Sequence, residues 1–184
     1  MFDERKVAQM AAYLLHKGGG TMPHLKLMKL LYLSDRESMD RYGTPISDDH
    51  IVAMPHGPVL SQTLNLIDGD VESREGGWED WISDKANHEV SLRSAINIEK
   101  MDELCEADIE VLNIVWGQFG HMKKWQIRDY THLHCHEWED PNGSSRPISH
   151  EMVFRALGKD AELTMELTQR LQSSNSMDEF FNSL

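Results

Sequence analysis

Apolar residues recur at the three- and four-residue spacing of an amphipathic helix in several segments of the chain. This spacing predicts a first helix from Asp3 to about Lys17, which the glycines at 18–20 end. A second predicted helix opens near Pro23 and ends before Gly43. Because apolar residues surround much of the girth of this second helix, we expect it to lie at the centre of the fold.

The pattern then changes to short extended segments. Residues 51–54 are predicted as a strand, and residues 55–59, with the sequence PHGPV, as a rigid elbow, since each proline fixes its own φ and favours an extended residue before it. A helix over residues 58–67 follows. Residues 78–83 and 89–93 alternate in the manner of a hairpin, which with the strand would make a small antiparallel sheet.

The second half of the chain is again helical in its spacing. Helices are predicted over residues 106–119, 122–133, 147–157 and 160–172, with a loop at 134–146. The predicted fold class is therefore mainly α (α+β), a compact helical domain with a small antiparallel sheet or hairpin. We expect a single domain over residues 1–172, with the tryptophans in its core, and a flexible C-terminal tail over residues 173–184.

Composition indicates where in the cell the protein is located. The chain has 184 residues and two cysteines, Cys105 and Cys135, too few for a disulfide framework. No apolar run approaches the length of a membrane span, and the charged N-terminus lacks the apolar core of a signal peptide. We therefore expect a cytoplasmic protein with reduced thiols, no membrane contact and no cofactor.

The net charge of −13 bears on the choice of partner. A surface with this balance repels nucleic acid and anionic membranes at long range, and it attracts a basic protein. Acidity also serves solubility alone in many small proteins, so charge by itself does not decide between these roles.

Motifs of catalysis are missing from the sequence. There is no glycine-flanked serine elbow, phosphate-binding glycine loop or dinucleotide fingerprint, so we expect no enzyme activity. One cluster, His132, His134, Cys135, His136 and Glu137, contains metal-ligand types. Its spacing fits no standard zinc pattern, and we therefore predict no metal, with the first four as weak candidates.

Residues 106–133 also fit a helix-turn-helix, with Gly120 in the turn, and such a unit reads DNA in many regulators. The second helix carries these cationic or polar side chains: Lys123, Lys124, Gln126 and Arg128. Asp129, the acidic run over residues 99–110 and the net charge all oppose phosphate binding. Nucleic acid is therefore an unfavoured partner.

An ordered set of motifs resembles the Panacea domain of SocA-like antitoxins. Its first half shows a lysine- and leucine-containing helix, then glycine and proline, then a strand entering P-x-G-P-V: Lys26, Lys29, Leu30, Leu31, Tyr32, Gly43, Pro45, Pro55, Gly57, Pro58 and Val59. The second half is similar over an acidic helix and a tyrosine–threonine–histidine step before a tryptophan: residues 106–119, Gly120, Tyr130, Thr131, His132 and Trp138. The resemblance covers about residues 5–158.

This resemblance implies an antitoxin of a toxin–antitoxin system from a prokaryote or phage, which binds a toxin encoded beside it. Given the acidity of this chain, we expect a basic toxin. One branch of the family instead delivers its toxin to a protease, and a DNA-binding regulator is a further alternative. We expect partner contact around Tyr32, Met54, His56, Thr131, His132 and Trp138 and at the tail residues Phe180 and Phe181. Pro55, Gly57 and Pro58 are expected to fix the elbow.

Overall fold

The fold is mainly α-helical with two small antiparallel sheets, which confirms the predicted fold class. The computed structural model describes the backbone of residues 2–182 and, apart from residues 99, 175 and 178–182, their side chains. Its helices are α1 (Glu4–Lys17), α2 (His24–Tyr42), α3 (Ser61–Asp68), α4 (Trp78–Trp81), η1 (Ile98–Lys100), α5 (Glu106–Phe119), α6 (Lys124–His134), α7 (His150–Ala156) and α8 (Ala161–Asn182). Its strands are β1 (Thr21–Pro23), β2 (Ile51–Met54), β3 (Gly57–Leu60), β4 (Glu89–Ser91) and β5 (Arg146–Pro147).

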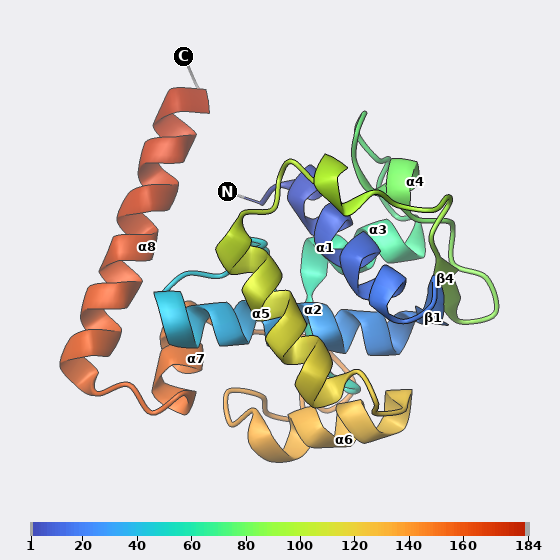
Figure 1. Ribbon diagram of the computed structural model, residues 1–184. Coiled ribbons are helices and arrows are strands. Elements are labelled where there is room, and N and C mark those ends of the chain that lie inside the picture. Colours follow the sequence, from blue (N-terminus) through green and yellow to red (C-terminus); the bar gives the residue numbers. More distant parts are fainter. Residues whose placement is uncertain (1, 183–184) are drawn as a thin grey trace.

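Helix α2 lies at the centre of the fold, as its apolar girth predicts. Figure 1 shows α1, α5 and α6 around it, and α2 contacts each of these helices as well as β3. Leu27, Leu30, Leu31 and Tyr32 of α2 are fully buried. Since burying one such side chain stabilises a protein by about 1.5–3 kcal/mol, α2 supplies a large part of the hydrophobic stabilisation.

The larger sheet has the strand order β3-β2-β5, and all its pairings are antiparallel. Ile51 lies opposite Leu60 and Met54 opposite Gly57, so that Pro55 and His56 form the tight connection between β2 and β3. The second sheet pairs β1 with β4. The predicted strand at residues 51–54 is therefore confirmed, and the elbow consists of the turn of a hairpin and the first three residues of β3.

The predicted hairpin of residues 78–83 and 89–93 is wrong in its first arm, which contains α4. The buried carboxylate of Glu4 accepts the first backbone N–H of α4, 2.9 Å away, and so favours a helical turn there. Strand β4 pairs with β1 instead, and two isolated bridges remain of the hairpin, Ile82 with Leu92 and Ala86 with Glu89. Strand β2 belongs to the other sheet.

Three helices begin later than predicted. The sequence predicts helices that open at Pro23, Pro58 and Pro147, yet these prolines lie in β1, β3 and β5. Proline is well suited to the first position of a helix, but it also fits strand positions whose N–H is not needed in the ladder, such as those of an edge strand. Strand pairing decides between the two, with residues far away in the sequence for β1 and β5 and with the adjacent β2 for β3. Helix α2 therefore starts one residue after its proline, and α3 and α7 start three residues after theirs.

Two buried carboxylates hold the loop between α2 and β2. Asp35 accepts the backbone N–H groups of Ile46 at 2.9 Å and Ser47 at 3.0 Å, and the Ser47 hydroxyl also donates to it. Burial raises the pKa of the Asp35 carboxyl to about 7. Asp49 accepts the backbone N–H groups of residues 62–63, in the first turn of α3. The loop is therefore fixed on both sides before the chain enters β2.

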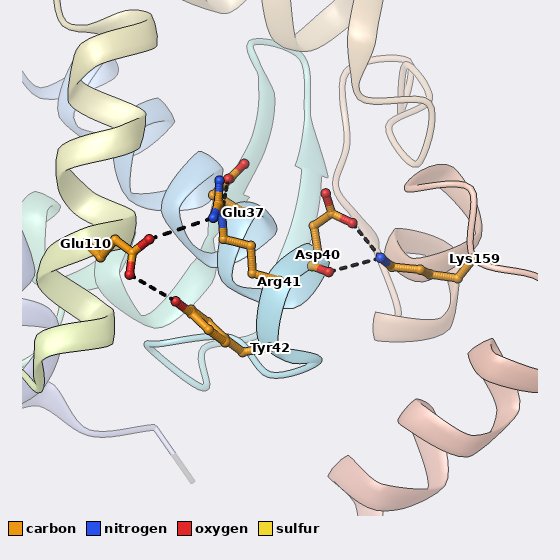
Figure 2. A network of polar contacts seen from close by, with 6 residues as sticks. All are labelled: Glu37, Asp40, Arg41, Tyr42, Glu110 and Lys159. Carbon is orange, nitrogen blue, oxygen red and sulfur yellow. Dashed lines mark hydrogen bonds and ion pairs between the residues drawn. The ribbon is translucent and has the colours of Figure 1, made fainter.

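Surface polar contacts join the end of α2 to its neighbours (Figure 2). Arg41 donates to Glu37 of the same helix at 2.6 Å, and across to α5 it lies 3.8 Å from Glu110. Lys159, between α7 and α8, donates to the carboxylate of Asp40 at 2.6 Å and to its carbonyl at 2.9 Å. Exposed pairs of this kind contribute about 0–1 kcal/mol each, so they add little to the stability of the fold.

Helix α8 packs against α7 through its first half and then extends along the side of the molecule (Figure 1). It continues through residues 173–182, for which the sequence predicts a flexible tail; the division into one domain and a tail stays a prediction. A groove of about 1010 Å³, lined by charges of both signs, separates Arg170 and Leu171 of α8 from residues 2–6 and 44–48. Within the described residues, no helix is long and apolar enough to cross a membrane.

Candidate functional site

The elbow packs on α2 and α6 through Gly57. This residue has φ +95°, a conformation that L side chains rarely adopt. A Cβ at this position would lie 2.8 Å from Thr131 Oγ1 and 3.0 Å from Lys29 Nζ. Glycine is therefore required twice, for the backbone conformation and for the close approach to α2 and α6, and the predicted structural role of Gly57 has a physical cause.

Lys29 connects α2 to the elbow from within the core. Its side chain is fully buried, and Nζ donates to the carbonyl of Pro58 at 2.6 Å. Burial lowers the pKa of the Lys29 ammonium to about 7, because the charged form loses its hydration. Thr131, also fully buried, donates its hydroxyl to the carbonyl of Arg128 at 2.8 Å, within α6.

A second buried polar group ties α2 to the loop that follows α6. The carboxylate of Glu137 accepts hydrogen bonds from the Tyr32 hydroxyl and, at 2.7 Å, from Arg36 Nε. Glu137 Oε2 is buried and has no hydrogen-bond partner among the described residues. Burial raises the pKa of the Tyr32 hydroxyl well above its usual range, so it acts as a donor at neutral pH. The pairing of Arg36 with Glu137 was not predicted from the sequence.

Trp138 fixes the same loop to the hairpin. Its indole Nε1 donates to the carbonyl of Met54 at 3.0 Å, and its ring stacks on His132 with centroids 3.9 Å apart and planes 6° apart. Burial lowers the pKa of His132, and the nearby cations of Arg128 and Lys29 lower it further. The imidazole that stacks on Trp138 is thus neutral at neutral pH.

An exposed surface of aromatic and cationic side chains lies next to the hydrogen-bonded elbow and the loop after α6. The Trp125 side chain is 47% exposed; His56 of the elbow meets its ring edge-on at 5.9 Å. Lys124 Nζ and the Arg128 guanidinium lie 5.2 Å and 4.9 Å from the centre of that ring. Leu133, about two turns further along α6 from Trp125, is 69% exposed. We give the name α6–elbow surface to this set of residues: His56, Lys124, Trp125, Arg128 and Leu133.

The prediction that the tryptophans lie in the core is wrong for Trp125. Trp78 is buried, whereas Trp125 lies on the outer side of α6, where Lys124 and Arg128 cover its faces. The cations one residue before and three residues after Trp125 were a local signal for an exposed ring, because long charged side chains and an indole combine at solvent-facing positions.

The structure brings together most of the residues predicted to contact a partner. His56 is exposed, and the half-buried Met54, His132 and Trp138 are linked to one another beside the elbow. Tyr32 and Thr131 are fully buried, so in this conformation they do not reach a partner and only hold their neighbours in position. The side chains of Phe180 and Phe181 lie outside the described residues. A role of these eight residues in partner binding stays a prediction.

The candidate metal ligands have different neighbours. His132 stacks on Trp138, and His134 packs on the ring of Tyr130 with centroids 4.5 Å apart. Cys135 is buried, and burial raises the pKa of its thiol to about 12, which disfavours the thiolate that a metal requires. His136 is exposed. Within the described residues, no three histidine, cysteine or acidic side chains converge as metal ligands.

Comparison with known proteins identifies the chain through the segment that builds this site. Residues 27–139 match a family model described as the antitoxin SocA-like, Panacea domain. The match begins in α2, includes the elbow and α6, and ends just after Trp138. Neither the search of curated proteins nor that of solved structures gives a match. Since the matched residues make up well over half of the chain, it belongs to the SocA-like antitoxin family with a Panacea domain.

Proposed function

We propose that this protein is an antitoxin that neutralises a cognate toxin by direct, stoichiometric binding in the cytoplasm. The observation that carries the proposal is the family match over residues 27–139. Binding without catalysis also agrees with the chemistry of the site, whose buried groups serve to hold the elbow and α6 together. Lys29 and Glu137, for example, are each used in a contact between elements.

The geometry supports a binding role in a second way. The elbow, α2 and the loop after α6 are joined by buried hydrogen bonds, so the surface above them is largely fixed before any partner arrives. A preformed surface loses less conformational entropy on association, and binding energy is then available for affinity. The toxin is expected to be encoded beside this protein, as the family resemblance implies.

Toxicity rescue tests the proposal. The neighbouring gene is expressed alone and together with this protein, and a tag on one chain is used to recover the other. We expect growth arrest by the toxin alone, normal growth with both proteins, and a complex of fixed stoichiometry. A harmless neighbour that forms no complex would contradict the proposal.

The toxin's abundance in the same cells separates neutralisation from delivery to a protease. Neutralisation leaves the toxin level unchanged and holds the toxin in the complex. Rescue with a loss of toxin, restored by deletion of a host protease, would show that the protein acts as an adaptor instead.

A further inference from the structure

The α6–elbow surface has the composition of an energetic centre in a protein–protein interface. We infer that it contacts the toxin and takes an acidic element of it around Trp125, an inference that rests on the proposed function. Tryptophan and arginine are the residue types most enriched among those that dominate binding energy. Trp125 and Arg128 lie together here, and both retain exposed area.

The local charge points to an acidic contact. Residues 121–134 contain three cations, Lys123, Lys124 and Arg128, against one anion, Asp129, for a local net charge of +2. The whole chain carries −13, so this segment has the opposite sign to the molecule. Asp129 bonds Arg128 at 2.8 Å and leaves the two lysines uncompensated within the segment. A carboxylate-bearing element is the complement of such a surface.

The apolar part of the surface sets the second requirement on the partner. Leu133 follows Trp125 by eight residues, which places it within about 80° of Trp125 around the helix. His56 extends the same surface onto the elbow. A toxin element that carries carboxylates beside apolar side chains would cover Trp125 and Leu133 and neutralise Lys124.

Pre-organisation favours the α6–elbow surface as the toxin contact over α8, although α8 also exposes apolar side chains. The Trp125 ring is in contact with His56, Lys124 and Arg128, so part of its rotamer entropy is already lost. On α8, Met165 is 58% exposed and makes no described polar or ring contact. Met165 is for that reason a matched control for an exposed apolar side chain.

Titration calorimetry with the purified toxin tests the inference. We expect Trp125→Ala to weaken binding at least 10-fold and Trp125→Phe to weaken it less, because the aromatic face remains. Tyr42→Ala and Met165→Ala, at exposed positions on α2 and α8, should bind within twofold of the wild type. Thermal unfolding of every variant checks that the fold is unchanged.

The outcomes separate the two proposals. If the wild-type protein forms no complex with the toxin, the proposed function itself fails. If the wild type binds and Trp125→Ala binds equally well, the function stands and the α6–elbow surface is excluded as its contact. A Trp125 variant that loses affinity for a single-stranded oligonucleotide but keeps the toxin would also overturn the inference, since aromatic and cationic side chains together bind bases too.

Discussion

At the scale of single residues, the buried ammonium of Lys29 makes the stability of the protein depend on pH. Its pKa is lowered to about 7 from 10.5, so between these values the unfolded chain binds more protons at this group than the folded one does. Stability then rises as the pH rises, because the penalty of burying the charge is relieved. We expect the wild type to gain up to about 2 kcal/mol between pH 7 and pH 9 relative to Lys29→Met.

The measurement is the free energy of unfolding from urea titrations at both pH values. Asp35, whose raised pKa makes stability fall from about pH 4 to about pH 7, is present in both proteins and cancels in the comparison. Lys100→Met, at an exposed position, serves as the control. Parallel pH profiles for the wild type and Lys29→Met would show that the ammonium is not buried in the folded state.

Gly57 is the residue on which the elbow depends. Gly57→Ala combines a left-handed backbone with a Cβ forced against Thr131 and Lys29, and we expect a loss of about 3 kcal/mol or more. Gly19 has a similar φ of +87°, but a Cβ added there would have no atom within 4 Å, so Gly19→Ala should lose about 1 kcal/mol. If both variants lose the same free energy of unfolding in thermal or urea titrations, the close approach at Gly57 contributes nothing to stability.

At the scale of elements, α3 is capped by a residue far away in the sequence. No side chain at its start caps it, and the carboxylate of Asp49 accepts the N–H groups of Gln62 and Thr63 at 2.9 and 2.8 Å. Asp49→Asn turns one acceptor into a donor that faces these N–H groups inside the protein. We expect a loss of about 2 kcal/mol in the free energy of unfolding.

Asp160→Asn is the matched control for this prediction. Asp160 is exposed and accepts the N–H of Leu163 at 2.9 Å, where asparagine caps as well as aspartate. Its unfolding free energy should therefore remain within about 0.5 kcal/mol of the wild type. Two similar losses would assign the effect to helix capping in general and not to the buried position of Asp49.

Helices and strands differ in how far the sequence predicts them. Apolar spacing located α1, α2 and α5 closely, because a helix satisfies its hydrogen bonds within its own segment. Strand β4 pairs with β1 about 70 residues earlier, and local alternation contains no information on that choice. The first arm of the predicted hairpin was wrong because the distant Glu4 accepts the first N–H of a helical turn there, a contact that local alternation does not reveal either.

The candidate site, too, was predicted only where its signal is local in the sequence. The PHGPV motif predicted the rigid elbow, since proline and glycine restrict the backbone locally. Its partners, Lys29 and Thr131, lie on separate helices and were recognised only by resemblance, without their contacts. The exposed position of Trp125 became clear once the packing of α6 was known, because the outer face of a helix depends on its neighbours.

At the scale of the whole molecule, total charge and local charge make opposite predictions for toxin binding. Lys124→Glu combined with Arg128→Glu changes the net charge from −13 to −17. If long-range attraction to a basic toxin governs the complex, this variant should associate faster. If the α6–elbow surface contacts an acidic element, the variant should dissociate faster and bind at least 10-fold more weakly, because like charges then meet at the contact.

The control variant Lys100→Glu with Arg170→Glu reaches the same net charge at exposed positions in η1 and α8. Association and dissociation rates of both double variants, measured at low and physiological salt, separate the two effects. Total charge alters the association rate of both variants alike, and more strongly at low salt, because ions screen exposed charges over a distance of about 10 Å at 0.1 M. A loss of affinity confined to the α6 variant would locate the decisive electrostatics at the α6–elbow surface, while equal effects would assign them to the molecule as a whole.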